Sequence, residues 1–231
     1  MNDIPQEVLE FCTEHKLTTD QFYGKTKYSR NLHPNSVTTL IPGFNPQVEC
    51  SLYLNSVTTL VPGFNPTVGG GLHLNSVATL VPEFNPFVGG GLYLDSVTTL
   101  VPGFNPQVGG CHLRSPQLAS LGDISTVGGS LSLVGCSSLR SLGSNLKSVR
   151  YLDLERTPVY VIPEDLVIGE GVWLDGPDRY IPAAEARWVL KEFKDSIKCA
   201  NDAGEVLLDR LNRPLWQVAY ATDYLNGDLQ V

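Results

Sequence analysis

Positive charge is missing from the middle of this 231-residue chain. Between Asn31 and His112 there is no Lys or Arg, and only Glu49, Glu83 and Asp95 carry charge. Over the whole chain, 24 acidic residues outnumber 16 basic ones, which gives a formal net charge of −8. Proteins that bind nucleic acids use Lys and Arg to neutralise phosphates. This distribution argues against direct nucleic-acid binding and leaves a protein partner, or acidic mimicry of a nucleic acid, as alternatives.

Patterns typical of metal sites, disulfides and membrane segments are also missing. The five cysteines are scattered, and none belongs to a Cys-x-x-Cys pair, so we predict neither a zinc site nor a disulfide framework. We predict no cofactor. The first residues lack the basic region and apolar run of a secretion signal, and no apolar stretch approaches the ~20 residues needed to span a bilayer. We therefore expect a reduced, cytoplasmic protein without membrane contact.

A twenty-residue unit is present instead, written four times between Leu32 and Gly110. Its cleanest copy occupies residues 52–71 and reads LYLNSVTTLVPGFNPTVGGG. A fixed period of about 20 residues indicates a solenoid, in which each repeat forms one coil. The Leu-x-Leu unit alternates with period two, as a half-buried strand does. One phenylalanine recurs in every copy, which predicts an internal stack of Phe44, Phe64, Phe84 and Phe104.

The glycine runs and the flanking segments complete the predicted architecture. We interpret Gly69-Gly70-Gly71 and its equivalents as tight turns, because glycine permits turn conformations and no Lys-Ser/Thr follows to make a phosphate loop. The repeat frame continues in degraded form, so we predict eight coils over residues 28–182. Apolar residues at helical spacing, Ile4, Val8, Phe11 and Cys12, predict an N-terminal helical cap within 1–27. A second amphipathic pattern predicts a C-terminal helical cap at 183–231.

Two motifs carry a resemblance to a known family. Residues 162–176 resemble a bacterial leucine-rich-repeat-like sequence, and the Phe-Asn-Pro-x-Val-Gly-Gly copies resemble repeat proteins of bacteriophages and bacteria. The resemblance implies a leucine-rich-repeat-like parallel β-solenoid and supplies no catalytic residues. It also implies a phage protein that binds a host protein, such as a defence enzyme. The chain departs from ordinary leucine-rich repeats at Val57, Val77 and Val97, where those repeats place an inward asparagine.

The outward residue of each Leu-x-Leu unit gives the leading functional hypothesis. If the coils stack in register, these residues form a row of aromatic and imidazole rings on the sheet face, and Trp173 continues it. Rigid, half-polar rings are typical of protein-binding surfaces, although cross-strand rings also stabilise a sheet by themselves. We therefore predict a non-enzymatic protein-interaction module. The predicted partner face comprises His33, Tyr53, His73, Tyr93, His112 and Trp173.

Three alternatives stay open. Arg114, Arg150 and Arg156 lie beyond the perfect copies and would form an anion site for a sequestered nucleotide-type ligand. The acidic C-terminal third would act as a nucleic-acid mimic. Trp216, Tyr220 and Tyr224 follow at helical spacing and would form either core or a homo-oligomer interface. A metal site is not expected, because histidines two coils apart are separated by about 9.6 Å.

Overall fold

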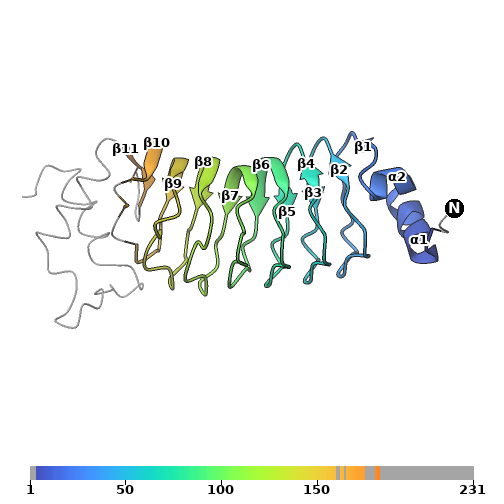
Figure 1. Ribbon diagram of the computed structural model, residues 1–231, viewed down its shortest axis with the longest axis horizontal. Helices are drawn as coiled ribbons and strands as arrows, with labels where there is room; N and C mark the ends of the chain where they lie inside the picture. The colour runs from blue at the N-terminus through green and yellow to red at the C-terminus, as the bar shows by residue number, and fades with distance from the viewer. Residues whose placement is uncertain (1–3, 160–161, 164, 175–179, 183–231) are drawn as a thin grey trace, which may run out of the picture.

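The chain folds into a parallel β-solenoid, as the repeat period predicts. The computed structural model describes residues 4–159, 162–163, 165–174 and 180–182, and these form about seven turns stacked end to end (Figure 1). The prediction of eight coils is not confirmed. The predicted C-terminal helical cap at 183–231 lies outside the described residues.

Strands on one side of each turn pair with the equivalent strands of the next turn. From β1 to β10 every pairing is parallel, and β10 ends the stack by pairing antiparallel with β11. The strands are β1 (Lys27–Tyr28), β2 (Gln47–Val48), β3 (Leu52–Tyr53), β4 (Thr67–Val68), β5 (Leu72–His73), β6 (Phe87–Tyr93), β7 (Gln107–His112), β8 (Thr126–Ser132), β9 (Ser148–Asp153), β10 (Val167–Trp173) and β11 (Tyr180–Pro182). Equivalent residues of successive copies are register partners, for example Leu52 with Leu72 and Leu72 with Leu92.

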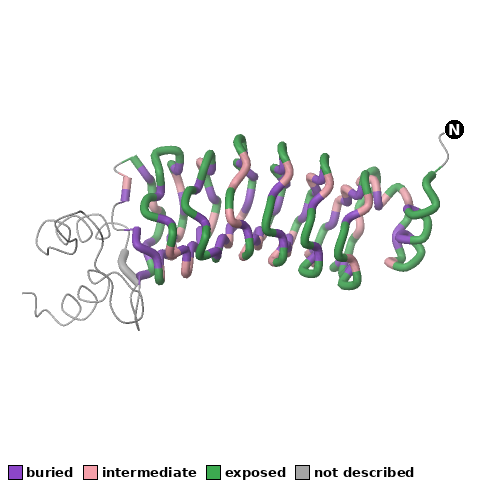
Figure 2. The backbone as a smooth tube through the Cα atoms, turned by 90° about the horizontal axis from the view of Figure 1, so that it is seen from below, coloured by how far each residue is buried: buried purple, intermediate pink, exposed green. Residues whose placement is uncertain are grey.

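The core is a column of side chains that repeats with the coil. Leu52, Leu54 and Val57 are fully buried, and burial alternates along every turn (Figure 2). The predicted phenylalanine stack is confirmed, with ring centroids 6.1 to 6.2 Å apart and ring planes within 8° to 11° of parallel. Buried aliphatic residues, among them Ile124, Leu146 and Leu166, fill the coils that follow.

The glycine runs act differently from the tight turns that we predicted. Gly89, Gly90 and Gly91 lie inside the extended strand β6, where the pairing register shifts between Val88 and Gly91. A Cβ atom added at Gly69 would lie 2.2 Å from the backbone oxygen of Glu49 on the preceding coil. The chain bends at Gly69 and Gly70, and glycine is also required at Gly69 because two backbones approach closely.

A ladder of asparagine side chains joins the coils at the Phe-Asn-Pro corner. The side-chain oxygens of Asn45, Asn65, Asn85 and Asn105 each accept a hydrogen bond from the backbone N–H twenty residues later. The amide nitrogen of Asn65 donates to the Glu83 carbonyl oxygen at 2.8 Å, and that of Asn85 to the Gly103 carbonyl oxygen at 2.8 Å. The ladder lies at a different corner from the inward asparagine of ordinary leucine-rich repeats.

Two short helices lie at the N-terminal end of the stack. Helix α1 (Gln6–His15) and helix α2 (Thr19–Phe22) place Phe11 and Phe22 against Phe44, with ring centroids 5.1 and 5.2 Å apart. Val8, Phe11 and Cys12 are buried, as predicted, whereas Ile4 is exposed because the helix begins only at Gln6. These contacts extend the internal phenylalanine stack beyond the first coil.

Candidate functional site

Five aromatic and imidazole rings form one continuous stack along the sheet. The ring centroids of His33, Tyr53, His73, Tyr93 and His112 follow one another at 4.3, 4.4, 4.3 and 4.4 Å, and neighbouring ring planes are within 5° to 9° of parallel. We refer to these five residues as the ring row. The parallel register produces it, because residues at the same place in successive coils are strand partners.

Glycine makes room for the central rings. A Cβ atom on Gly71 would lie 2.9 Å from His73 Nε2, and one on Gly91 would lie 2.9 Å from Tyr93 Cε2. The rings of His73 and Tyr93 therefore lie back along their strands, over the glycine two residues earlier. Each inner ring has both faces covered by its neighbours, so only its edge is left uncovered by another ring.

Two imidazoles of the ring row have a lowered pKa. Burial lowers the pKa of His73, an effect that Asp95 opposes and His33 reinforces. Burial also lowers the pKa of His112, with a further decrease from Arg114 and His73 and an opposing increase from Asp95. Both imidazoles are therefore less readily protonated than an exposed histidine.

A second, polar row flanks the rings two residues further along each strand. It contains Asn55, Asn75, Asp95 and Arg114, and Arg114 Nη2 lies 3.3 Å from His112 Nδ1. Among the described atoms, Asn75 Oδ1 and Asp95 Oδ1 are buried without a hydrogen-bond partner. The ring row thus ends, toward the C-terminus, beside a carboxylate and a guanidinium.

Trp173 belongs to the same register row as the rings but is separated from them. Pairing places Ser132 next to His112, then Asp153, and then Trp173. Ser132 is buried and its hydroxyl lies 3.3 Å from Asp153 Oδ2. Of the six residues of the predicted partner face, five therefore form the continuous stack, and Trp173 lies three coils beyond its end.

Two of the three arginines of the predicted anion site, Arg114 and Arg150, lie far apart. Arg114 follows strand β7 beside His112, whereas Arg150 lies within β9, before the buried Leu152. In the strand register, Arg114 and Arg150 are separated by five positions, or roughly 16 Å, and by two coils. The Arg150 guanidinium lies 3.2 Å from Glu170 Oε1 and also over the ring of Tyr151. Arg156 is exposed and has a positive φ of 57°. The structure does not bring Arg114 and Arg150 into one site.

The remaining predictions are placed as follows. Trp216, Tyr220 and Tyr224 lie outside the described residues. Within the described part of the chain, no three His, Cys, Asp or Glu side chains gather as metal ligands would. In that same part, no helix has the length and apolar character required to cross a membrane.

The chain matches no family model, and no curated protein or solved structure is similar to it.

Proposed function

We propose that the protein is a non-enzymatic interaction module that binds another protein through the ring row. The observation that carries the proposal is the stack itself, in which five rings are ordered at 4.3 to 4.4 Å before any partner arrives. A protein partner that binds fixed side chains loses less conformational entropy than one that must first immobilise them. Tyrosine is also enriched among the residues that contribute most to binding energy.

The charge pattern supports a protein partner more than a nucleic acid. The coils that carry the ring row have no Lys or Arg between Asn31 and His112, so they cannot neutralise a phosphate backbone. The exposed ring edges offer hydroxyl and imidazole groups that donate and accept hydrogen bonds. A flat, hydrogen-bonding strip without Lys or Arg suits the polar and aromatic surface of a folded protein.

The resemblance of the repeats supports a more specific proposal. The Phe-Asn-Pro-x-Val-Gly-Gly copies resemble leucine-rich-repeat-like proteins of bacteriophages and bacteria. On that basis the protein is a phage product that acts in the host cytoplasm, where it binds and inhibits a host protein, for example a defence enzyme. The glycine-backed rings provide a surface that such an inhibitor can present without changing shape.

The ring row also stabilises the sheet, so the test has to separate binding from stability. Tyr53→Ala/Tyr93→Ala removes two rings, and Thr59→Ala/Thr99→Ala is the matched control. Both threonines are exposed and lie on the same two coils, in a separate row of isolated parallel bridges. Both variants are first compared with the parent protein by circular dichroism and thermal unfolding.

Affinity capture from a bacterial lysate, with quantitative mass spectrometry, then tests the proposal. We expect the parent protein and the threonine variant to retain the same partner, and the folded tyrosine variant to lose it. Equal retention of that partner by the folded tyrosine variant would refute the ring row as the binding face.

A further inference from the structure

The ring row has two ends, and the end at His33 has an open face. His33 is exposed, and one side of its imidazole is stacked on Tyr53 with centroids 4.3 Å apart. Tyr53 is the only ring that contacts His33 among the described residues. At the other end, His112 is followed by the buried Ser132 and is flanked by Arg114. Only the His33 end offers an exposed terminal ring on which one more flat group could be stacked.

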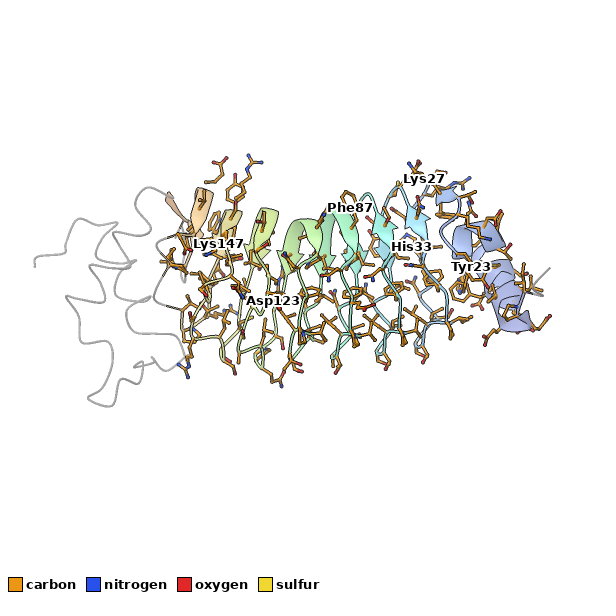
Figure 3. All side chains as sticks on the ribbon, in the orientation of Figure 1. Tyr23, Lys27, His33, Phe87, Asp123 and Lys147 are labelled. Atoms are coloured by element: carbon orange, nitrogen blue, oxygen red, sulfur yellow. The ribbon has the colours of Figure 1, made fainter. Side chains whose placement is uncertain are left out.

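Positive charge gathers next to this open end. Lys25, Lys27 and Arg30 precede the stretch without Lys or Arg, and Lys27 belongs to the first strand, β1. Figure 3 shows Lys27 and His33 at the same end of the solenoid, the end that carries α1 and α2. Arg30 is three residues before His33, so their Cα atoms are at most roughly 11 Å apart.

These cations are weakly engaged by the protein. Lys27 Nζ lies 4.0 Å from Glu49 Oε1, and the two side chains are 67% and 50% exposed, respectively. Exposed pairs of this kind contribute little and are easily exchanged for another anion. Arg30 has no ion-pair partner among the described residues. An arriving anion would therefore displace little at this end.

We propose that the outer face of His33 binds the base of a free mononucleotide, with its phosphate held by Arg30. The base would continue the column of parallel rings by one member, since base–aromatic stacking tolerates any flat heterocycle. The guanidinium of Arg30 would supply paired N–H donors to the phosphate oxygens. A single nucleotide fits better than a strand, because the coils after Asn31 have no cation to follow a phosphate backbone.

This site uses the outer face of His33, which is the terminal member of the ring row, whereas the partner-binding test removes Tyr53 and Tyr93, so the two proposals can fail separately. The test uses the full-length protein. The probe is AMP, titrated while the imidazole C–H signals are followed by NMR, with His33→Ala identifying the His33 signal. Ribose 5-phosphate lacks the base and adenosine lacks the phosphate. We expect AMP to shift the His33 signal and to bind about tenfold more tightly than either fragment.

Matched variants locate the site. Arg30→Gln should weaken AMP binding while leaving adenosine binding unchanged, and His33→Ala should abolish the advantage of AMP over ribose 5-phosphate. His112→Ala removes the ring at the other end of the row and should leave AMP binding as it was. Equal binding of AMP and ribose 5-phosphate by the parent protein, no shift of His33 at millimolar AMP, or preferential binding of a deoxyadenosine decamer would each overturn the proposal.

Discussion

The coils of residues 32–110 and those of 111–174 share one fold but are held together by different chemistry. The first set has stacked phenylalanines inside, stacked His and Tyr rings outside and an asparagine ladder at the corner. In the second set, aliphatic residues fill the core, and charged side chains join adjacent coils through Lys147 with Asp165 and Arg150 with Glu170. The ring row runs along the first set and ends at His112, in the first strand of the second set.

This difference shows that the solenoid itself does not require rings on its surface. The pairings of β8 with β9 and of β9 with β10 follow the same parallel pattern, with one register shift each, as the pairing of β6 with β7, although Ser132 and Asp153 replace the rings. The near-identical copies therefore have stacked surface rings that the parallel pairing of the coils does not require. We attribute these surface rings to partner binding.

Shortening one member of the internal phenylalanine stack should lower the free energy of unfolding more than any other change considered for the two sets of coils. Phe64 is buried between Phe44 and Phe84, so Phe64→Ala should leave a cavity and lower the free energy of unfolding by about 3 to 5 kcal/mol. Ile124→Val, in the second set of coils, should cost only about 0.5 to 1.5 kcal/mol. Urea unfolding measures both. Similar costs for the two variants would mean that the phenylalanine stack is no more sensitive than the aliphatic core.

Breaking the asparagine ladder should have the next largest effect. Asn85→Ala removes the acceptor for the Asn105 backbone N–H and the donor to the Gly103 carbonyl oxygen. Two lost hydrogen bonds should lower the free energy of unfolding by about 1 to 3 kcal/mol. Asn55→Ala is the control, because Asn55 makes no hydrogen bond to any described residue. If both variants cost the same in urea unfolding, the ladder does not stabilise the first set of coils.

Acid should destabilise the first set of coils through the ring row. The pKa values of His73 and His112 lie below the ordinary 6.5, so the folded state disfavours their protonation. Their contribution to stability is complete above pH about 6.5 and is lost as the pH falls through that value toward the folded-state pKa. Thermal unfolding between pH 7.5 and 5 should therefore show a decreasing midpoint, and His73→Tyr/His112→Phe should flatten that decrease. An unchanged slope in the double variant would assign the acid sensitivity to other groups.

The ion pairs of the second set of coils should matter least. Arg150 and Glu170 lie 3.2 Å apart, with 58% and 44% of their side chains exposed. Exposed pairs contribute about 0 to 1 kcal/mol and are screened by salt. Glu170→Gln should therefore shift the unfolding midpoint slightly at low salt and not at all in 1 M NaCl. A large effect that persists at high salt would show that charge pairs hold these coils as strongly as ring stacks hold the others.

The fold and the ring row followed from the sequence because both depend on period alone. A repeat of 20 residues places His33, Tyr53, His73 and Tyr93 on equivalent strand positions, and the parallel register puts these residues side by side. The asparagine ladder was missed because Asn65 stands between Phe64 and Pro66, in a segment that composition assigns to a turn. We predicted turns for the glycine-rich strand because glycine is typical of turns. The aromatic residue two positions after a glycine could have indicated instead that the ring packs over the glycine.

Separations between side chains were less accessible to sequence reasoning. Arg114 and Arg150 lie only two coils apart, yet Arg114 follows its strand, whereas Arg150 lies within its strand. Trp173 lies in the same register row as the rings but does not contact them, because Ser132 and Asp153 occupy the coils between it and His112. Which row a residue belongs to can be predicted from a repeat, but which residues touch depends on what fills every coil between them.

Site-specific photo-crosslinking to the captured partner would test the binding face most directly. A photoreactive side chain replaces either Asn55, beside the ring row, or Thr59, four residues later on the same coil, and both positions are exposed. Neither substitution removes a ring. Crosslinks from position 55 and none from position 59 are the predicted result. Crosslinks from position 59 alone would place the partner on the threonine row and contradict a binding face built from stacked rings.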